Sequence, residues 1–230
     1  QRVGYAVTWI DNNSGCKGAC DRVNNVPLLA ADKARWCNDG ECHDDLLADT
    51  FADYISRATV NDRVVVLHQE GSHGPAYFRR YPDAFKRFTP TCDSNALQSC
   101  TQQQVINTYD NTIAYTDHIL GRIIDTLKGQ DDRYQTVMVY ASDHGESTGE
   151  HGLYLHGAPY LFAPSQQTHV PMMAWLSPDF QQQGPSSSCL TNQAQKPQSH
   201  DTIFHSFLGL LGVKTAVYNV TLDWSDACQR

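Results

Sequence analysis

The residue types with the clearest chemistry are an adjacent carboxylate and imidazole, Asp143 and His144, within the run 142–147. They follow the apolar run 137–141, and Gly145 comes next, so we expect a buried strand to give way to a loop here. Such strand ends are where α/β enzymes place groups that converge on a ligand. A carboxylate with an imidazole also matches a catalytic zinc site, which keeps an open position for substrate. The alternative is a structural pair in which Asp143 orients a surface histidine.

Two further histidines occupy comparable positions in the sequence. His73 lies in a loop with glycine and proline just after the apolar run 63–68, and His156 is followed directly by glycine. Because imidazole is the commonest metal ligand in proteins, both are candidates for the same site. Other histidines have structural interpretations. We expect His118 on the solvent face of a helix, and His200 as a helix cap or as a residue that orients a ligand.

Segment 11–18 is a second candidate for ligand binding, because it follows a strand-like run and supplies backbone amides, a hydroxyl and Lys17. Such a loop can hold a phosphate. An ordinary turn closed by a disulfide explains the same residues equally well. A group-transfer site also needs a nucleophile, and the nearest hydroxyls, Ser142 and Ser147, have no evident activating base in the sequence.

The eight cysteines fall mostly in close pairs and contain no CxxC knuckle of the kind that binds zinc. We therefore predict local disulfides formed in an oxidising compartment. By the chain-entropy model each short loop contributes roughly 2 kcal/mol to stability. The predicted pairs are Cys16–Cys20, Cys37–Cys42, Cys92–Cys100 and, from the two cysteines that remain, Cys189–Cys228.

Hydrophobic periodicity predicts the elements that position these residues. Continuous apolar runs indicate buried strands, and apolar positions at three- and four-residue spacing indicate amphipathic helices. Segment 181–199 is polar and is expected to be a surface loop. Strands alternating with helices predict an α/β fold with a mostly parallel sheet sandwiched by helices. The expected strands are 5–10, 63–68, 136–141 and 170–176, and the expected helices are 44–58, 102–128 and 201–211.

Size and charge exclude some functions. A chain of 230 residues with 40% hydrophobic residues fits one large domain with a substantial core. The formal net charge of −8 argues against a nucleic-acid partner, which would require a basic surface. No apolar run reaches the length that crosses a bilayer.

Five motifs together resemble a known family, the phosphoethanolamine transferases. These are bacterial inner-membrane enzymes that modify lipid A, and they include the mobile colistin-resistance proteins. The resemblance extends from about Trp9 to Leu211, and the paired cysteines match as well. The motifs are His73-Gly74-Pro75-Ala76-Tyr77-Phe78, Tyr109-Asp110-Asn111-Thr112, Ser142-Asp143-His144-Gly145-Glu146-Ser147, Tyr154-Leu155-His156-Gly157 and Phe162-Ala163-Pro164.

The resemblance implies an alkaline phosphatase/sulfatase-like fold at the periplasmic face of the inner membrane. It implies a zinc-dependent double displacement: a Thr attacks phosphatidylethanolamine, diacylglycerol leaves, and phosphoethanolamine passes to a lipid A phosphate, which confers polymyxin and colistin resistance. By matching positions, Asp143 and His144 would bind zinc. His73 and His156 would hold the phosphoethanolamine or a second zinc. The residues that would contact the head group are Asn13, Lys17 and Glu146.

The family's nucleophilic Thr, one Glu zinc ligand and the membrane-spanning helices correspond to sequence before residue 1. We therefore expect residues 1–230 to be the C-terminal part of a periplasmic catalytic domain, held at the membrane by preceding helices and monomeric. Alone, it is expected to lack turnover. One alternative is a related sulfatase or phosphodiesterase, although the chain has no Cys/Ser-x-Pro-x-Arg signature. The other is an inactive fragment that binds a metal or a lipid head group.

Overall fold

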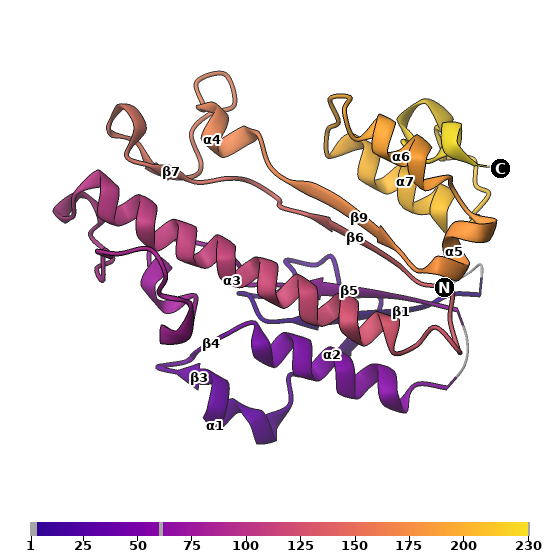
Figure 1. Cartoon of the computed structure of the whole chain (residues 1–230), viewed down its shortest axis with the longest axis horizontal. Helices are drawn as coiled ribbons and strands as arrows, with labels where there is room; N and C mark the ends of the chain where they lie inside the picture. The colour runs from indigo at the N-terminus through magenta and orange to yellow at the C-terminus, as the bar shows by residue number, and fades with distance from the viewer. Residues whose placement is uncertain (1–3, 60–61, 230) are drawn as a thin grey trace. The chain divides into compact units, whose positions relative to one another are not determined.

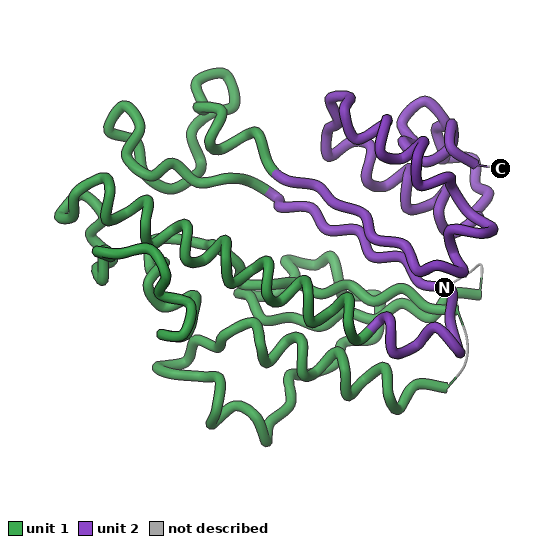
Figure 2. Tube along the Cα trace, in the orientation of Figure 1, with its two compact units in different colours: residues 1–126, 144–170 green, residues 127–143, 171–230 purple. Residues whose placement is uncertain are grey.

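The computed structural model describes residues 4–59 and 62–229 of the chain. Two compact units can be distinguished (Figure 2): unit 1 comprises residues 1–126 and 144–170, and unit 2 comprises 127–143 and 171–230. Each unit is described by itself. None of the helices formed by the described residues is long and apolar enough to cross a membrane.

Unit 1 contains a three-stranded parallel sheet with β1 (Ala6–Asp11) at its centre. β2 (Asn24–Val26) and β5 (Arg63–His68) pair with it on either side, and both run parallel to it. β1 and β5 were predicted from their apolar runs. Their register pairs Asp11 with His68, so the loops that follow the two strands leave the same edge of the sheet.

Two long helices of unit 1 supply much of its core (Figure 1). α2 (Asp45–Arg57) packs on β1 and buries Leu46, Leu47 and Phe51. α3 (Gln102–Lys128) has the bounds that its periodicity predicted. The two helices are joined by a buried hydrogen bond of 2.6 Å from the Tyr115 hydroxyl to the Asp45 carboxylate. α2 therefore covers part of the parallel sheet, and the Tyr115–Asp45 hydrogen bond holds α3 against α2.

Short elements complete unit 1. Two antiparallel pairs are formed by β3 (Cys37–Asn38) with β4 (Glu41–Cys42), and by β7 (Ser147–Thr148) with β8 (Tyr154–Leu155). The remaining helical turns are α1 (Lys33–Trp36), α4 (Ser165–Thr168), η1 (Ala30–Asp32), η2 (Tyr77–Arg79), η3 (Asp83–Phe85), η4 (Leu97–Ser99) and η5 (Glu150–Gly152).

Unit 2 is built on β6 (Val137–Ala141) and β9 (Met172–Leu176), which pair antiparallel with Val139 opposite Ala174. Both strands were predicted, and the parallel pairings lie in unit 1. The helices of this unit are α5 (Pro178–Gln183), α6 (Ser187–Gln193), α7 (Asp201–Leu210), η6 (Val220–Leu222) and η7 (Asp226–Cys228).

The loop predicted over 181–199 is wrong in part, because α5 and α6 occupy much of it. A local signal marks the start of α5: the Ser177 hydroxyl caps the helix by accepting from the Phe180 amide, and Pro178 follows at the first helical position. Because the segment is polar, hydrophobic periodicity did not predict the two short helices. All four predicted disulfides are present in the structure.

Candidate active site

Three histidines from separate segments of unit 1 converge. His73 lies in the loop after β5, His144 begins the second segment of the unit, and His156 follows β8. Each offers a ring nitrogen, and these nitrogens all lie within 4.8 Å of one another. The rings of His144 and His156 stack with their centroids 3.8 Å apart, and the His73 ring centroid lies 5.1 Å from that of His156. Residues that are 71 and 12 positions apart therefore form one cluster of donors.

The carboxylate of Glu146 lies buried beneath this cluster and accepts three hydrogen bonds. The donors are the Gly74 amide at 3.3 Å, the Tyr77 hydroxyl at 3.1 Å and His156 Nδ1 at 3.0 Å. Because a carboxylate can only accept, Nδ1 of His156 donates to it, which leaves Nε2 for another partner. Metal-binding histidines are commonly oriented by a carboxylate in this way.

His144 is oriented by its own backbone neighbourhood. Its Nδ1 lies 3.1 Å from the Gly145 carbonyl oxygen, which also only accepts, so the lone pair again lies on Nε2. The Gly145 amide in turn donates to the Gln167 carbonyl at 3.0 Å. A Cβ at position 145 would collide with the backbone oxygen of Gln166, so this close backbone approach requires glycine.

The Tyr77 hydroxyl helps to hold Glu146 in place by donating to its carboxylate. The Tyr77 side chain is fully buried, and burial followed by the negative charge of Glu146 raises the pKa of its hydroxyl far above the ordinary value. Tyr77 therefore stays protonated and acts as a donor to the carboxylate. It belongs to a buried cluster against which Leu155 packs. Leu155 has a positive φ of 65°, which is uncommon for a residue other than glycine and turns the chain directly before His156.

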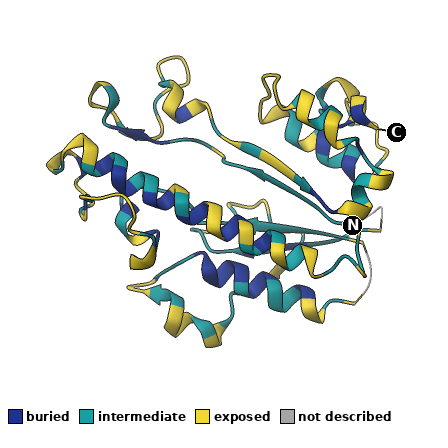
Figure 3. Ribbon diagram, in the orientation of Figure 1, coloured by how far each residue is buried: buried dark blue, intermediate teal, exposed yellow. Residues whose placement is uncertain are grey.

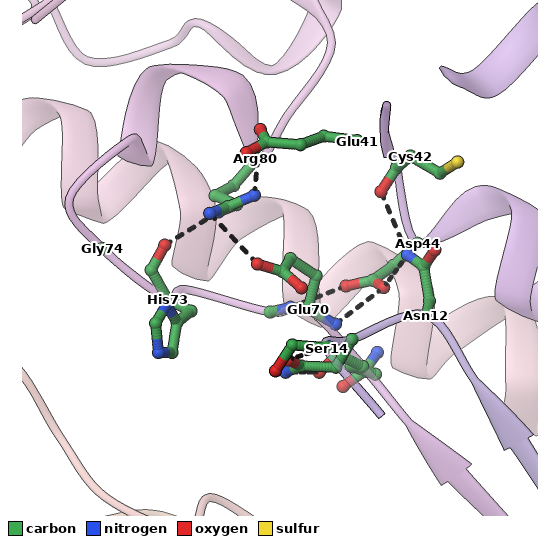
Figure 4. Close-up of polar contacts among 12 residues, drawn as sticks. Asn12, Ser14, Glu41, Cys42, Asp44, Glu70, His73, Gly74 and Arg80 are labelled. Carbon is green, nitrogen blue, oxygen red and sulfur yellow. Dashed lines mark hydrogen bonds and ion pairs between the residues drawn. The ribbon is translucent and has the colours of Figure 1, made fainter. Parts of the chain in front are cut away.

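Arg80 fixes the loop that carries His73 (Figure 4). Its Nε donates to the His73 carbonyl at 2.8 Å, and its two terminal nitrogens lie 3.0 Å from Glu70 and 3.2 Å from Glu41. The side chain of Arg80 is only 6% exposed. Burial raises the pKa of the Glu70 carboxyl, while the charge of Arg80 acts against that shift. Arg80 thus stabilises the backbone on which the His73 ring is mounted.

Asp44, just before α2, ties the loops after β1 and β5 together (Figure 4). Its carboxylate accepts from Asn12 Nδ2 at 2.7 Å, from the Gly71 amide at 2.8 Å and from the Glu70 amide at 3.1 Å. Complete burial raises the pKa of this carboxyl, and these hydrogen bonds act in the opposite direction. Sequence reasoning missed Asp44, Glu70, Tyr77 and Arg80, because no pattern in a single chain marks which polar residues will be buried.

The structure accounts for the other predicted residues in different ways. Asn13 holds its loop together: its Nδ2 donates to the Gln69 carbonyl at 3.0 Å, and its Oδ1 accepts from the Ser14 amide at 2.6 Å. Lys17 is exposed, with a positive φ of 46° in the turn closed by Cys16–Cys20. The head-group contacts assigned to Asn13, Lys17 and Glu146 stay predictions, and the contacts of Glu146 are with protein donors.

Asp143 ends the first segment of unit 2, where it is exposed and joined to His144 by the peptide bond. The backbone beside it is fixed: the Ser142 amide donates to the Pro171 carbonyl at 3.2 Å, and His200 Nε2 lies 2.7 Å from the Ser142 carbonyl oxygen. His200 therefore holds the end of β6. It occupies the N-cap position of α7, but its side chain makes no capping hydrogen bond there, and a role in orienting a ligand stays a prediction. Zinc binding by Asp143 stays a prediction.

The donor set of the histidine cluster fits zinc. Imidazole nitrogens are preferred ligands of this ion, and both His144 and His156 have the hydrogen-bonded second nitrogen that such ligands show. One other group among the described residues brings cysteine and aspartate atoms close together, but its cysteines are Cys16 and Cys20, whose sulfurs are joined in a disulfide. A cavity of about 250 Å³ is lined by His144 and His156. The rest of its lining comes from Gly157, Ala158, Ala163, Gln167 and Thr168.

Comparison with known proteins gives consistent results. The family model described as Sulfatase matches residues 1–213. Phosphoethanolamine transferase EptA of Salmonella typhimurium LT2 is 49% identical over 232 residues, which span 100% of this chain and 42% of that protein. The chain thus spans about two fifths of the length of that relative.

Two solved structures are also similar. The soluble domain of lipooligosaccharide phosphoethanolamine transferase A from Neisseria meningitidis has a TM-score of 0.94 and 43% identity, covering 100% of this chain and 69% of that one. The C-terminal periplasmic domain of phosphoethanolamine transferase EptC from Campylobacter jejuni has a TM-score of 0.80 and 42% identity, covering 99% of this chain and 69% of that one. The sulfatase-like α/β fold predicted from the sequence is confirmed.

Proposed function

Because the chain belongs to the sulfatase family and, within it, to the phosphoethanolamine transferases, we propose that it is part of the catalytic domain of such an enzyme. The enzyme would move phosphoethanolamine from phosphatidylethanolamine to a phosphate of lipid A. The observation that carries the proposal is the convergence of His73, His144 and His156, with ring nitrogens within 4.8 Å of one another. Ring nitrogens that converge in this way can hold a metal ion, which when bound would stabilise the negative charge that develops on a phosphoryl group.

We propose zinc as the cofactor, held by His144 with Asp143, while His73 and His156 bind the phosphoryl group or a second zinc. When bound, zinc would polarise the phosphoryl oxygens and lower the pKa of the attacking group. The chain's own residues supply the rest. Glu146 keeps the proton of His156 on Nδ1, Arg80 holds the His73 loop, and the exposed ammonium group of Lys17 can attract the phosphate.

The attacking Thr, which the family resemblance assigns to sequence before residue 1, is part of this proposal. The reaction would proceed through two displacements at phosphorus. The Thr oxygen forms a bond to phosphorus as diacylglycerol leaves, and an oxygen of a lipid A phosphate then displaces the Thr. The proposed location is the periplasmic face of the inner membrane, and the proposed outcome is polymyxin and colistin resistance. A monomeric state also stays a prediction.

A reconstituted transfer assay tests this function. The full-length protein would be incorporated into vesicles of phosphatidylethanolamine and lipid A, and the products would be followed by mass spectrometry. We expect lipid A to gain phosphoethanolamine while diacylglycerol is released, and we expect His144→Ala and His73→Ala to abolish transfer. The control is His118→Ala, because His118 is a half-exposed histidine of unit 1 outside the cluster.

Two results would contradict the proposal. Release of free phosphoethanolamine with unmodified lipid A would identify a hydrolase, which is the sulfatase- or phosphodiesterase-like alternative. Zinc binding without either product would identify a protein that binds a metal or a lipid head group without turnover.

A further inference from the structure

An apolar loop projects beside the histidine cluster. It comprises residues 157–164, between His156 and α4, and its tip is Tyr160-Leu161-Phe162. These three residues are 87%, 85% and 74% exposed, and Figure 3 colours the loop before α4 mainly as exposed. Single exposed apolar residues are ordinary on protein surfaces, but three large consecutive ones at a site mark a contact surface.

The base of this loop is fixed although its tip is exposed. The Phe162 and Ala163 amides donate to the Pro159 carbonyl at 2.8 and 2.9 Å, which closes a compact turn. The Gln167 side chain is buried; it accepts from the Ala158 amide at 3.3 Å and donates to the Ser147 hydroxyl at 2.8 Å. The turn therefore presents its three apolar side chains from a defined frame within unit 1.

The loop is continuous with the candidate active site. The cavity of about 250 Å³ is lined by His144 and His156 together with three residues of the loop, Gly157, Ala158 and Ala163, and by Gln167 and Thr168 of α4. The same short segment thus forms a wall of the cavity and carries the exposed tip. Two residues that line the cavity, Ala158 and Ala163, are close in sequence to Tyr160 and Phe162.

The distribution of charged residues along the chain favours a membrane as the partner of this apolar loop. The chain has a net charge of −8, yet no Asp, Glu, Lys or Arg lies between Glu150 and Asp179. An acidic surface is repelled by an anionic membrane, whereas an uncharged loop approaches the membrane without that cost. Tyr is enriched at the boundary between head groups and acyl chains, and Leu and Phe are typical of the apolar surface that interfacial segments bury there.

We propose that Tyr160, Leu161 and Phe162 insert into the interfacial layer of a phospholipid bilayer and seat the active site on the donor lipid. The inference rests on the proposed function and deepens it. The reacting phosphorus of the donor lies in its head group while its acyl chains stay in the bilayer. The wall of the cavity must therefore meet the head-group layer, and an apolar tip that enters this layer stabilises the encounter.

Site-specific labelling tests the insertion without measuring activity. All eight cysteines of residues 1–230 are paired in disulfides, so Leu161→Cys adds one free thiol to this part of the protein for an environment-sensitive fluorophore, and labelling of the unsubstituted full-length protein gives the background. The matched control is Val217→Cys, an exposed apolar position of unit 2. On phosphatidylethanolamine vesicles we expect a blue shift at 161 and quenching by lipid-borne nitroxides, with neither at 217.

Two labelling results would overturn the insertion. A label at 161 that stays open to an aqueous quencher on vesicles would show that the loop does not enter the bilayer. Protection from that quencher without quenching by the lipid nitroxides would show that another part of the protein covers the loop.

A second variant separates this inference from the proposed function. Replacing Tyr160, Leu161 and Phe162 by Ser should lower transfer from vesicle-embedded phosphatidylethanolamine by about tenfold or more, because the apolar contact with the bilayer is lost. Turnover of a water-soluble short-chain donor should stay unchanged. Equal loss on both donors, or on neither, would overturn the inference. If the wild type uses neither donor, the proposed function fails, and the labelling result still decides insertion.

Discussion

Glu146→Gln tests the buried carboxylate that orients the site. The Glu146 side chain is only 3% exposed and accepts from Gly74, Tyr77 and His156. The amide fills the same space but removes the charge, so the charge-assisted bond to His156 becomes a neutral one, at a cost of about 1 kcal/mol in unfolding free energy. Zinc affinity should fall by about 10- to 100-fold, as is typical when the partner of a ligating histidine is lost.

Glu146→Ala should have a larger effect on stability. It leaves the buried Gly74 amide and Tyr77 hydroxyl without a partner, each at about 1–3 kcal/mol, and removes the bond to the partly exposed His156, so the unfolding free energy should fall by several kcal/mol even if the losses are not additive. Urea denaturation would measure stability, and competition with a fluorescent chelator would measure zinc affinity. The control is Glu150→Gln, because the Glu150 carboxylate accepts from Thr148 close by in the chain. Zinc affinity in Glu146→Gln equal to that of the control would refute the orienting role.

Three further outcomes are expected. Arg80→Ala should lower the unfolding free energy by about 3–5 kcal/mol, because Glu70 loses its buried cation. In contrast, Arg57→Ala, an exposed i,i+4 pair with Asp53, should change the unfolding free energy by about 0.5 kcal/mol or less in the same urea titration. Equal effects of the two changes would contradict the role of Arg80. Burial acts to raise the pKa of Glu150, but hydrogen bonds from Thr148 outweigh it and hold the pKa below the ordinary 4.5. The unfolded chain therefore takes up this proton first as pH falls, so wild type should lose stability relative to Glu150→Gln as pH drops below 4.5; a constant difference would contradict this. Removing the Cys189–Cys228 disulfide, with a sequence separation of 39, should cost about 4 kcal/mol by chain entropy, against about 2 kcal/mol for Cys16–Cys20 with a separation of 4. Thermal unfolding of the two double-serine variants would reveal the difference, and the reverse order would count against it.

Periodicity was sufficient to predict the main elements. The continuous β-branched run at Val64–Leu67 and the long three- and four-residue spacing of 102–128 gave β5 and α3. Local spacing was also sufficient for the disulfides, since three of the pairs close short loops. The pairing of β6 with β9 and the helices within 181–199 depend on tertiary packing and on a cap at Ser177, which periodicity does not report.

The sequence was sufficient to predict the histidines of the candidate site, but not the residues that hold them in position. His73, His144 and His156 could be selected because each lies in a loop beside glycine, and His73 and His144 also follow predicted strands. Tyr77 and Arg80 could not, because their importance comes from burial and from partners at other positions of the chain. Glu146 was selected for a head-group contact, whereas its observed partners are Gly74, Tyr77 and His156.

Zinc content measures most directly whether His144 and the residues that converge with it form a zinc site. Elemental analysis of the full-length protein and of its His144→Ala and His118→Ala variants, each checked by intact mass, would decide the question. We expect about one zinc or more per chain in wild type and His118→Ala, and loss of zinc in His144→Ala. Full zinc content in His144→Ala, or no zinc in a correctly folded wild type, would contradict it.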